Sequence, residues 1–212
     1  MKYQGVIFDL DGVLCFTDKY HYKAWKAVAD EIGVYFDEQI NNRLRGVSRM
    51  DSLDIILERS TKSYSAEEKM QLAEKKNDLY RALLADMTPA DLSDEVRDTL
   101  NALKKAGLKL AIGSSSKNTK FILERIGLNG FFDAISDGTN ISRSKPDPQV
   151  FTMAAEFIAL PPTACLVVED AEAGIKAAIG GGFDSAGLGE AAACGKATYA
   201  MHSFKDLLGI CL

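Results

Sequence analysis

Three short, mainly apolar runs of the chain each end abruptly in polar residues. The runs cover residues 5–8, 108–112 and 165–168, and acidic residues or a glycine with serines follow each one directly. Runs of this length and composition are typical of strands that are buried on both faces, as they are in parallel sheets. The carboxyl ends of parallel strands meet at one edge of a sheet, so the pattern predicts that these polar residues gather there.

Amphipathic helices are predicted between these runs. Apolar residues recur at helical spacing over residues 96–106 and 121–126, and a glycine follows each segment. A third helix is predicted to begin at Asp147-Pro148, because proline is favoured in the first turn of a helix and glycine just beyond the last turn. The alternation of strands and helices predicts a doubly wound parallel α/β sheet, which binds ligands beyond the carboxyl ends of its strands.

After the first apolar run the strand pattern gives way to consecutive helical segments. Apolar residues repeat at helical spacing over residues 22–32. Ser48 with Asp51, and Ser65 with Glu68, have the spacing of capping boxes at the start of a helix. We predict at least four helices here and interpret them as one inserted helical domain.

This organisation divides the chain into two domains. We expect residues 1–15 and 92–212 to form the α/β core domain, and residues 16–91 to form a helical cap domain inserted after the first strand. Because the insertion leaves the sheet just after Asp11 and returns near Leu92, the cap would lie over the end of the first strand. It is therefore placed to act as a lid over that edge of the sheet.

The composition is that of a globular chain with enough apolar residues for a sizeable core. Of 212 residues, 47% are hydrophobic and 26% are charged, which excludes a disordered, collagen-like or membrane-spanning chain. Lysine and arginine number 25 against 30 acidic residues, a net charge of -5 without any basic block. This charge disfavours nucleic acid as a partner but leaves a small anionic substrate open, because a few converging cations suffice to bind one.

Cysteine and histidine are too few and too scattered to form a metal cluster. The four cysteines have no close pairs, and the chain has only two histidines. Scattered cysteines are typical of a reduced compartment, and the N-terminal residues lead into the first strand without a signal-peptide pattern. We expect a cytoplasmic protein with no membrane partner, and a monomer because no apolar stripe demands a second chain.

Four acidic residues follow two of the predicted strands. Asp9 and Asp11 follow the first strand, and Glu169 and Asp170 follow the last. An aspartate pair alone could equally cap a helix or lie on a loop. Four carboxylates in one crevice, however, repel each other unless a cation is bound or some of them are protonated. Oxygen ligands without histidine or cysteine favour Mg²⁺.

The remaining polar segments offer groups that suit a phosphate. Ser114–Ser116 supply hydroxyl and backbone N–H groups where a helix is expected to begin, although serines there could also be plain N-caps. Lys145 precedes a proline, which disfavours a helical conformation and indicates a fixed loop. A metal ion and a lysine beside an aspartate can neutralise phosphoryl oxygens while the carboxylate attacks phosphorus.

At these positions the sequence resembles the haloacid-dehalogenase superfamily of aspartyl phosphotransferases. Four motifs occur in the order typical of that superfamily: Phe8-Asp9-Leu10-Asp11-Gly12-Val13, Gly113-Ser114-Ser115, Lys145-Pro146-Asp147-Pro148 and Val168-Glu169-Asp170. The resemblance implies that Asp9 is the nucleophile and forms a phosphoaspartate, and that Asp11 is the general acid and base. It also implies that Ser114 and Lys145 bind the phosphoryl group. The implied Mg²⁺ ligands are Asp9, Asp11 through its carbonyl group, Glu169 and Asp170.

The insertion resembles that of the β-phosphoglucomutases within this superfamily. The substrate-binding residues that this resemblance implies are His21, Trp25, Arg45, Gly46, Val47, Ser48, Arg49, Lys76, Asn77, Ser114, Ser115, Ser116, Lys117 and Asn118. A mutase must hold a sugar bisphosphate in two orientations, and Arg49 has the bidentate donors that a second phosphate site needs. His21 and Trp25 also fit ordinary packing of the cap, and Arg49 and Lys76 also fit solvated surface charges.

The implied activity is the Mg²⁺-dependent interconversion of β-D-glucose 1-phosphate and glucose 6-phosphate, through an aspartyl phosphate and β-glucose 1,6-bisphosphate. One alternative is a sugar-phosphate phosphatase of the same superfamily, in which water takes the phosphoryl group. Another is a non-enzymatic receiver that a partner phosphorylates, but a passive switch needs neither a large insertion nor Asp11. The implied second phosphate site favours the mutase, since a phosphatase needs none.

Overall fold

A parallel sheet positions the polar strand ends. The computed structural model describes residues 2–45 and 47–212. Six strands lie in the order β3-β2-β1-β4-β5-β6, and every neighbouring pair is parallel. They are β1 Gly5–Phe8, β2 Lys109–Gly113, β3 Ala134–Ser136, β4 Cys165–Glu169, β5 Asp184–Gly187 and β6 Tyr199–Ala200. The predicted doubly wound parallel α/β sheet is confirmed.

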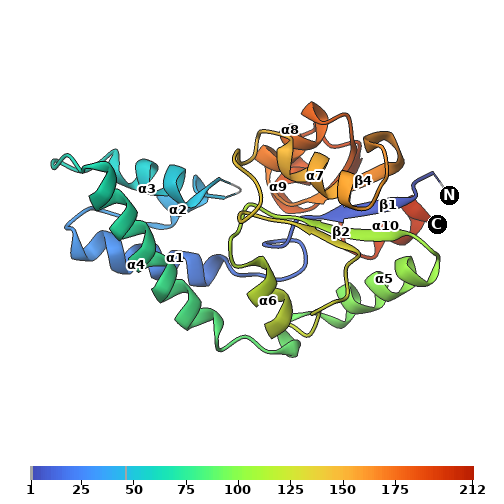
Figure 1. Cartoon of the computed structure of the whole chain (residues 1–212), viewed down its shortest axis with the longest axis horizontal. Helices are drawn as coiled ribbons and strands as arrows, with labels where there is room; N and C mark the ends of the chain where they lie inside the picture. The colour runs from blue at the N-terminus through green and yellow to red at the C-terminus, as the bar shows by residue number, and fades with distance from the viewer. Residues whose placement is uncertain (1, 46) are drawn as a thin grey trace.

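Helices cover both faces of this sheet (Figure 1). They are α5 Asp94–Lys105, α6 Thr119–Arg125, α7 Gln149–Phe157, α8 Glu172–Gly180, α9 Gly189–Ala193 and α10 Asp206–Cys211, with 3-10 turns η1 Pro89–Asp91 and η2 Pro162–Ala164. Val6 and Phe8 of β1 belong to the apolar core that α5, α6 and α10 share, whereas Ile7 belongs to the core that α7 and α8 share. Because side chains alternate along a strand, a strand covered on both faces is apolar at every position.

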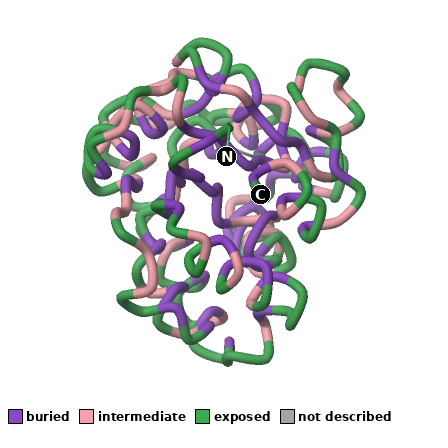
Figure 2. The backbone as a smooth tube through the Cα atoms, turned by 90° about the vertical axis from the view of Figure 1, so that its right-hand side faces the viewer, coloured by how far each residue is buried: buried purple, intermediate pink, exposed green. Residues whose placement is uncertain are grey.

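Four further helices form a group beside the sheet, on the left of Figure 1. They are α1 Asp18–Glu31, α2 Glu38–Asn42, α3 Arg49–Leu57 and α4 Ala66–Leu84. Their apolar faces enclose a core that includes Trp25, Leu53 and Ala73. Figure 2 shows the buried stretches of the chain at the centre of the molecule and the exposed turns around them. The prediction of at least four helices between the first two strands is confirmed.

Helix boundaries follow the signals in the sequence. Helix α4 begins at a complete capping box, in which the Ser65 hydroxyl accepts from the Glu68 N–H at 3.2 Å and the Glu68 carboxylate accepts from the Ser65 N–H at 2.8 Å. At α3 only the first half is present, since the Ser48 hydroxyl accepts from the Asp51 N–H at 3.1 Å. Helices α5 and α6 end within two residues of the predicted glycine stops, and α7 begins directly after Pro148.

No predicted element corresponds to the strands β3, β5 and β6 or to the helices α9 and α10. Each of the three strands is short, and β5 reads Asp-Ser-Ala-Gly, without a single large apolar residue.

All four cysteines are free thiols. Within residues 2–45 and 47–212 no helix combines the length and the apolar character that crossing a bilayer requires.

Replacing Ser65 with alanine should lower the free energy of unfolding by about 0.5–2 kcal/mol, because α4 loses the side-chain oxygen that satisfies its third N–H group. Chemical denaturation measures the change. Ser63→Ala, at an exposed position two residues earlier, is the matched control and should stay within about 0.5 kcal/mol of the wild type. Equal losses for the two variants would contradict the capping box.

Candidate active site

Carboxylates at the ends of β1 and β4 converge. Asp9 directly follows β1, Glu169 is the last residue of β4, and Asp170 comes next. The two strands are neighbours, with Phe8 opposite Val168, so their ends lie at the same level of the sheet. One carboxylate oxygen from each of the three acids lies within 4.8 Å of the other two. The structure thus brings these three predicted site residues into one acidic cluster.

The carboxylate of Asp11 lies outside this cluster of three. Its Oδ1 accepts a hydrogen bond from the Thr17 hydroxyl, just before α1. Burial raises the pKa of Asp11, and the Thr17 hydrogen bond opposes that shift. The chain turns at Gly12, whose φ is +84°, and a Cβ atom there would lie 2.1 Å from Asp170 Oδ2. Glycine therefore lets this first loop approach the acidic cluster.

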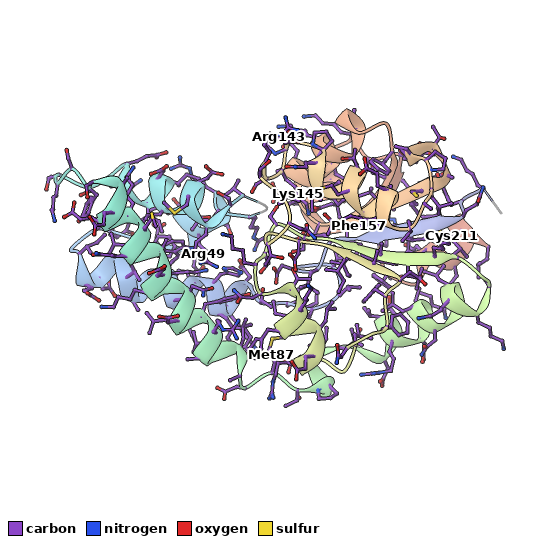
Figure 3. The ribbon with its side chains drawn as sticks, in the orientation of Figure 1. Arg49, Met87, Arg143, Lys145, Phe157 and Cys211 are labelled. Carbon is purple, nitrogen blue, oxygen red and sulfur yellow. The ribbon has the colours of Figure 1, made fainter. Side chains whose placement is uncertain are left out.

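A single lysine binds two members of the acidic cluster. Lys145 Nζ donates to Asp9 Oδ1 at 2.5 Å and also to Glu169 Oε1, and the residue is only 3% exposed. Burial lowers the pKa of Lys145, but the two carboxylates outweigh burial and hold that pKa above its usual value. Figure 3 labels Lys145 at the edge of the sheet that faces the helical insertion. The ammonium group is therefore a fixed positive charge at the ends of β1 and β4.

One lysine does not neutralise three carboxylates, of which Asp9 and Glu169 are buried and Asp170 is partly exposed. Burial raises the pKa of Asp9, Lys145 opposes that shift, and repulsion from Glu169 and Asp170 adds to it. Burial, followed by repulsion from Glu169, raises the pKa of Asp170 to about 7. Excess negative charge on hard oxygen donors is the environment that a small divalent cation stabilises. The cluster therefore fits Mg²⁺, with Asp9, Glu169 and Asp170 as the available carboxylate ligands.

The turn between β4 and α8 holds Glu169 in place. Its Oε2 accepts hydrogen bonds from the backbone N–H groups of Asp170 and Ala171, at 2.9 and 3.0 Å. A Cβ atom at Gly174 would lie 1.9 Å from Glu169 Oε1. Glycine at this position of α8 consequently makes room for the carboxylate that Lys145 binds.

The loop after β2 forms a series of serine turns. The Ser114 hydroxyl accepts from the Ser116 N–H at 3.2 Å, and the Ser116 hydroxyl accepts from the Asn118 N–H at 3.1 Å. The helix α6 begins only at Thr119, and no side chain caps it, so the interpretation of the serines as plain N-caps is wrong. The buried Ser115 hydroxyl has no hydrogen-bond partner within the described residues.

A cavity of about 1310 Å³ separates the strand ends from helices α1, α3 and α4. The predicted site residues that line it are Asp9, Asp11, His21, Trp25, Arg45, Val47, Ser48, Arg49, Lys76, Ser114, Ser115, Ser116, Lys117, Asn118, Lys145, Glu169 and Asp170. Asn77 is not part of the lining, and Gly46 lies outside the described residues. A cavity of this size accommodates a small organic ligand with polar groups at both ends.

The insertion places a second buried lysine in the cavity wall. Lys76 is 3% exposed, and its ammonium group lies over the rings of Trp25 and Tyr80 at 5.0 and 4.4 Å from their centroids. Burial, with repulsion from Arg49, lowers the pKa of Lys76 to about 7. Lys76 Nζ lies 2.8 Å from His21 Nδ1, and burial lowers the pKa of His21 well below its usual value. A neutral His21 thus accepts a hydrogen bond from the lysine.

Two arginines of the insertion have different surroundings. Arg45 Nη2 lies 3.0 Å from Asp18 Oδ2, an exposed ion pair. Arg49 Nη2 donates to Asn77 Oδ1 at 2.8 Å, and within the described part of the chain no carboxylate lies close enough to pair with Arg49. The half-buried Arg49 guanidinium, labelled in Figure 3 on the helical side, therefore faces the cavity without a counter-ion.

Three residues that contact the site have no signal in the sequence. The Thr17 hydroxyl binds Asp11. The Tyr80 ring lies against His21, with the ring centroids 4.1 Å apart and the ring planes tilted by 33°. Arg81 donates to Asn118 at 3.1 Å. Most of these contacts join residues that are far apart along the chain, so spacing alone does not reveal them.

Comparison with known proteins agrees with this geometry. The family model described as haloacid dehalogenase-like hydrolase matches residues 3–182. The chain belongs to this family and is an enzyme of the haloacid-dehalogenase superfamily. The fold and the four motifs support the same family membership, because the residues of the acidic cluster and Lys145 are motif residues.

Its relatives include both mutases and phosphatases. The chain is 40% identical over 189 residues to a β-phosphoglucomutase of Bacillus subtilis (strain 168), which covers 88% of this chain and 84% of that protein. It is 31% identical over 185 residues to a fructose-1-phosphate phosphatase of Escherichia coli (strain K12), covering 87% and 95%. The crystal structure of a β-phosphoglucomutase from Clostridium difficile superposes with a TM-score of 0.91 at 36% identity, covering 97% and 93%.

Lys76→Met should stabilise the protein most at low pH. The folded protein carries a buried ammonium below about pH 7, whereas an unfolded lysine stays protonated up to about pH 10.4. Between these values the unfolded state binds the extra proton, so the stability of the wild type rises with pH by about 1.4 kcal/mol per unit at most. The methionine variant lacks this rise, and its advantage should shrink as pH increases from about 6 to about 9.

Denaturation curves of both proteins at several pH values measure this difference. Lys75→Met, at the exposed neighbouring position, is the matched control. A stability difference between Lys76→Met and the wild type that stays constant with pH would contradict the lowered pKa of Lys76.

Proposed function

We propose that this chain is a Mg²⁺-dependent β-phosphoglucomutase that interconverts β-D-glucose 1-phosphate and glucose 6-phosphate through β-glucose 1,6-bisphosphate. The observation that carries this proposal is a single cavity with a cation at each end. Lys145 lies at the sheet end beside Asp9, and Arg49 lies on the helical side without a carboxylate partner in the described residues. A bisphosphate needs an anion site at both ends, whereas a phosphatase acting on a monophosphate needs one.

Asp9 is the proposed nucleophile. Lys145 binds its Oδ1 and leaves Oδ2 without a hydrogen-bond partner among the described residues. In the proposed step this carboxylate oxygen forms a bond to phosphorus while the bond from phosphorus to the sugar oxygen breaks, which leaves a phosphoryl group on Asp9. Lys145 and Ser114 would bind the phosphoryl oxygens and offset their charge.

Asp11 is the proposed general acid and base. The Thr17 hydroxyl holds its carboxylate in the cavity wall, two residues from the nucleophile. In this role Asp11 donates a proton to the sugar oxygen that leaves phosphorus, and removes a proton from the sugar hydroxyl that attacks in the return step. A phosphoryl group can then return from Asp9 to a different oxygen of the sugar.

Asp9, Glu169, Asp170 and the carbonyl group of Asp11 would hold Mg²⁺. The three carboxylates support this assignment because their oxygens converge and their charge exceeds that of Lys145. When bound, Mg²⁺ would supply positive charge to the phosphoryl oxygens during transfer. Lys145 contributes a further fixed charge through its contacts with Asp9 and Glu169.

Residues 16–91 are proposed to act as the cap that presents the second phosphate site and contacts the sugar. The proposed distal phosphate ligands are Arg49, Ser116, Lys117 and Asn118, with Asn77 behind them, and the proposed sugar contacts are His21, Trp25, Arg45, Val47, Ser48 and Lys76. The apolar ring of Trp25 and the polar groups of Ser48 and Lys76 face one cavity, which supports recognition of a sugar. Ser115 is the proposed additional donor at the phosphoryl end.

The products formed from β-glucose 1-phosphate distinguish the mutase from its alternative. With Mg²⁺ and a trace of β-glucose 1,6-bisphosphate, the purified enzyme should form glucose 6-phosphate with little release of inorganic phosphate. Coupled assays for the two products measure both outcomes. Release of phosphate without glucose 6-phosphate would overturn the mutase and favour a sugar-phosphate phosphatase, the activity that relatives such as the Escherichia coli protein represent.

Asp11→Asn should lower turnover by about 10²–10⁴-fold, because the amide cannot exchange the proton that the sugar oxygens require. Steady-state kinetics measure the loss. Asp98→Asn, an exposed substitution of the same kind on α5, is the control and should keep the wild-type rate. A rate for Asp11→Asn that equals the wild-type rate would remove Asp11 from the chemical step.

A further inference from the structure

A chain of hydrogen bonds runs from α4 to the loop before α6, returns to α4 and ends at α3. Arg81 Nη1 donates to Asn118 Oδ1 at 3.1 Å. Asn118 Nδ2 donates to Asn77 Oδ1 at 2.9 Å, and Arg49 Nη2 donates to the same oxygen at 2.8 Å. Asn77 and Arg81 are four residues apart, so both lie on one face of α4 and hold the Asn118 side chain between them.

The direction of this chain follows from what each group can donate. A guanidinium has no acceptor, so Arg81 requires the carbonyl oxygen of the Asn118 amide to face it. The NH₂ group of Asn118 must then face Asn77, and it requires an oxygen there. That same Asn77 oxygen is the acceptor for Arg49. Arg81 and Arg49, at the two ends of the chain, therefore both require this orientation of the two amides.

Without Arg81 only Arg49 holds the two amides in this orientation, and no donor in the chain any longer requires the Asn118 oxygen. If the Asn118 oxygen faces Asn77, the NH₂ group of Asn77 turns toward it, and Arg49 loses its acceptor. No other hydrogen bond to the Arg49 guanidinium occurs within residues 2–45 and 47–212. Arg81 thus stabilises the orientation of Arg49 in the cavity, through two amides that lie between them.

Arg81 is itself held away from the cavity. Its guanidinium lies over the Phe121 ring at 4.6 Å from the centroid, and it is not one of the residues that line the cavity. On α6, Arg125 donates to the backbone carbonyls of Ala85 and Met87, just beyond α4. These hydrogen bonds fix α6 against the end of α4, and α6 in turn places the Phe121 ring under the Arg81 guanidinium.

We infer that Arg81 is a positioning residue for the second phosphate site, which orients the Arg49 guanidinium through the side-chain amides of Asn118 and Asn77. The inference rests on the proposed function in one respect, the assignment of Arg49 to the phosphate that lies away from Asp9. It adds a residue that touches neither substrate nor metal and yet sets the affinity of the site.

Arg81→Met should raise the KM for β-glucose 1-phosphate by about 3–10-fold, the value of one hydrogen bond, with a smaller change in kcat. Phosphorylation of Asp9 by acetyl phosphate, which is too short to reach Arg49, should keep the wild-type rate. General damage to the fold would slow both reactions. Arg81→Lys keeps a donor without an acceptor and should restore most of the KM. Arg97→Met, which removes an arginine that donates to the Pro89 carbonyl, is the matched control.

A double-mutant cycle tests whether Arg81 acts through Asn77. In an Asn77→Ala background, Arg81→Met should add nothing to the KM, because the amide that transmits its effect is gone. Independent, additive effects would overturn the inference, and so would a wild-type KM for Arg81→Met alone.

A measurement without substrate separates this inference from the proposed function. If the wild type forms no glucose 6-phosphate, the proposed function fails in the unmodified enzyme. NMR signals of the Asn77 and Asn118 side-chain amides and of the Arg49 guanidinium still report on the hydrogen-bond chain. Arg81→Met should shift all three sets of signals and Arg97→Met none, and unchanged Arg49 signals in Arg81→Met would overturn the inference.

Discussion

A single buried lysine balances much of the negative charge on which the site depends. Lys145 bridges Asp9 and Glu169, which come from neighbouring strands that meet at one level of the sheet. Removing one partner of such a buried pair leaves an uncompensated charge, so its members depend on each other. Gly174 in α8 leaves space for the Glu169 carboxylate, so the same ion pair also requires a glycine at this position. Because three carboxylates share one lysine, and repulsion from Glu169 helps to raise the pKa of Asp170 to about 7, the cluster still fits a divalent cation.

The helical insertion contributes groups that the sheet lacks. Two cationic side chains of the insertion place positive charge opposite the acidic cluster. One is Lys76, which aromatic rings and His21 enclose, and the other is Arg49, which donates to Asn77. Hydrogen bonds connect the insertion to the core beside the cavity, from Thr17 to Asp11, from Arg81 to Asn118 and from Asn118 to Asn77. Hydrogen bonds therefore join the two sides of the cavity, the sheet end and the helical insertion. A ligand with an anionic group at each end would contact both sides.

The sequence predicts those parts of the fold that burial alone dictates. The central strands β1, β2 and β4 are mainly apolar because helices cover both faces of the sheet, and the predicted glycine stops fall just beyond α5 and α6. The strand β5 escapes prediction because its small and polar residues are held by pairing with β4 and β6, and not by their own propensity. In the site, the motifs identify Asp9 and Glu169, whereas the partner of Asp11 and the acceptor of Arg49 depend on how distant segments fold together.

The central claim is that Asp9 accepts a phosphoryl group, and the most direct test identifies the residue that carries it. The enzyme is incubated with Mg²⁺ and a phosphoryl donor, quenched and reduced with borohydride, which converts an aspartyl phosphate into homoserine. Peptide mapping by mass spectrometry then locates the change. Conversion of Asp9 alone is predicted. Conversion of another carboxylate, or an unmodified Asp9 in an enzyme that turns over substrate, would contradict the claim.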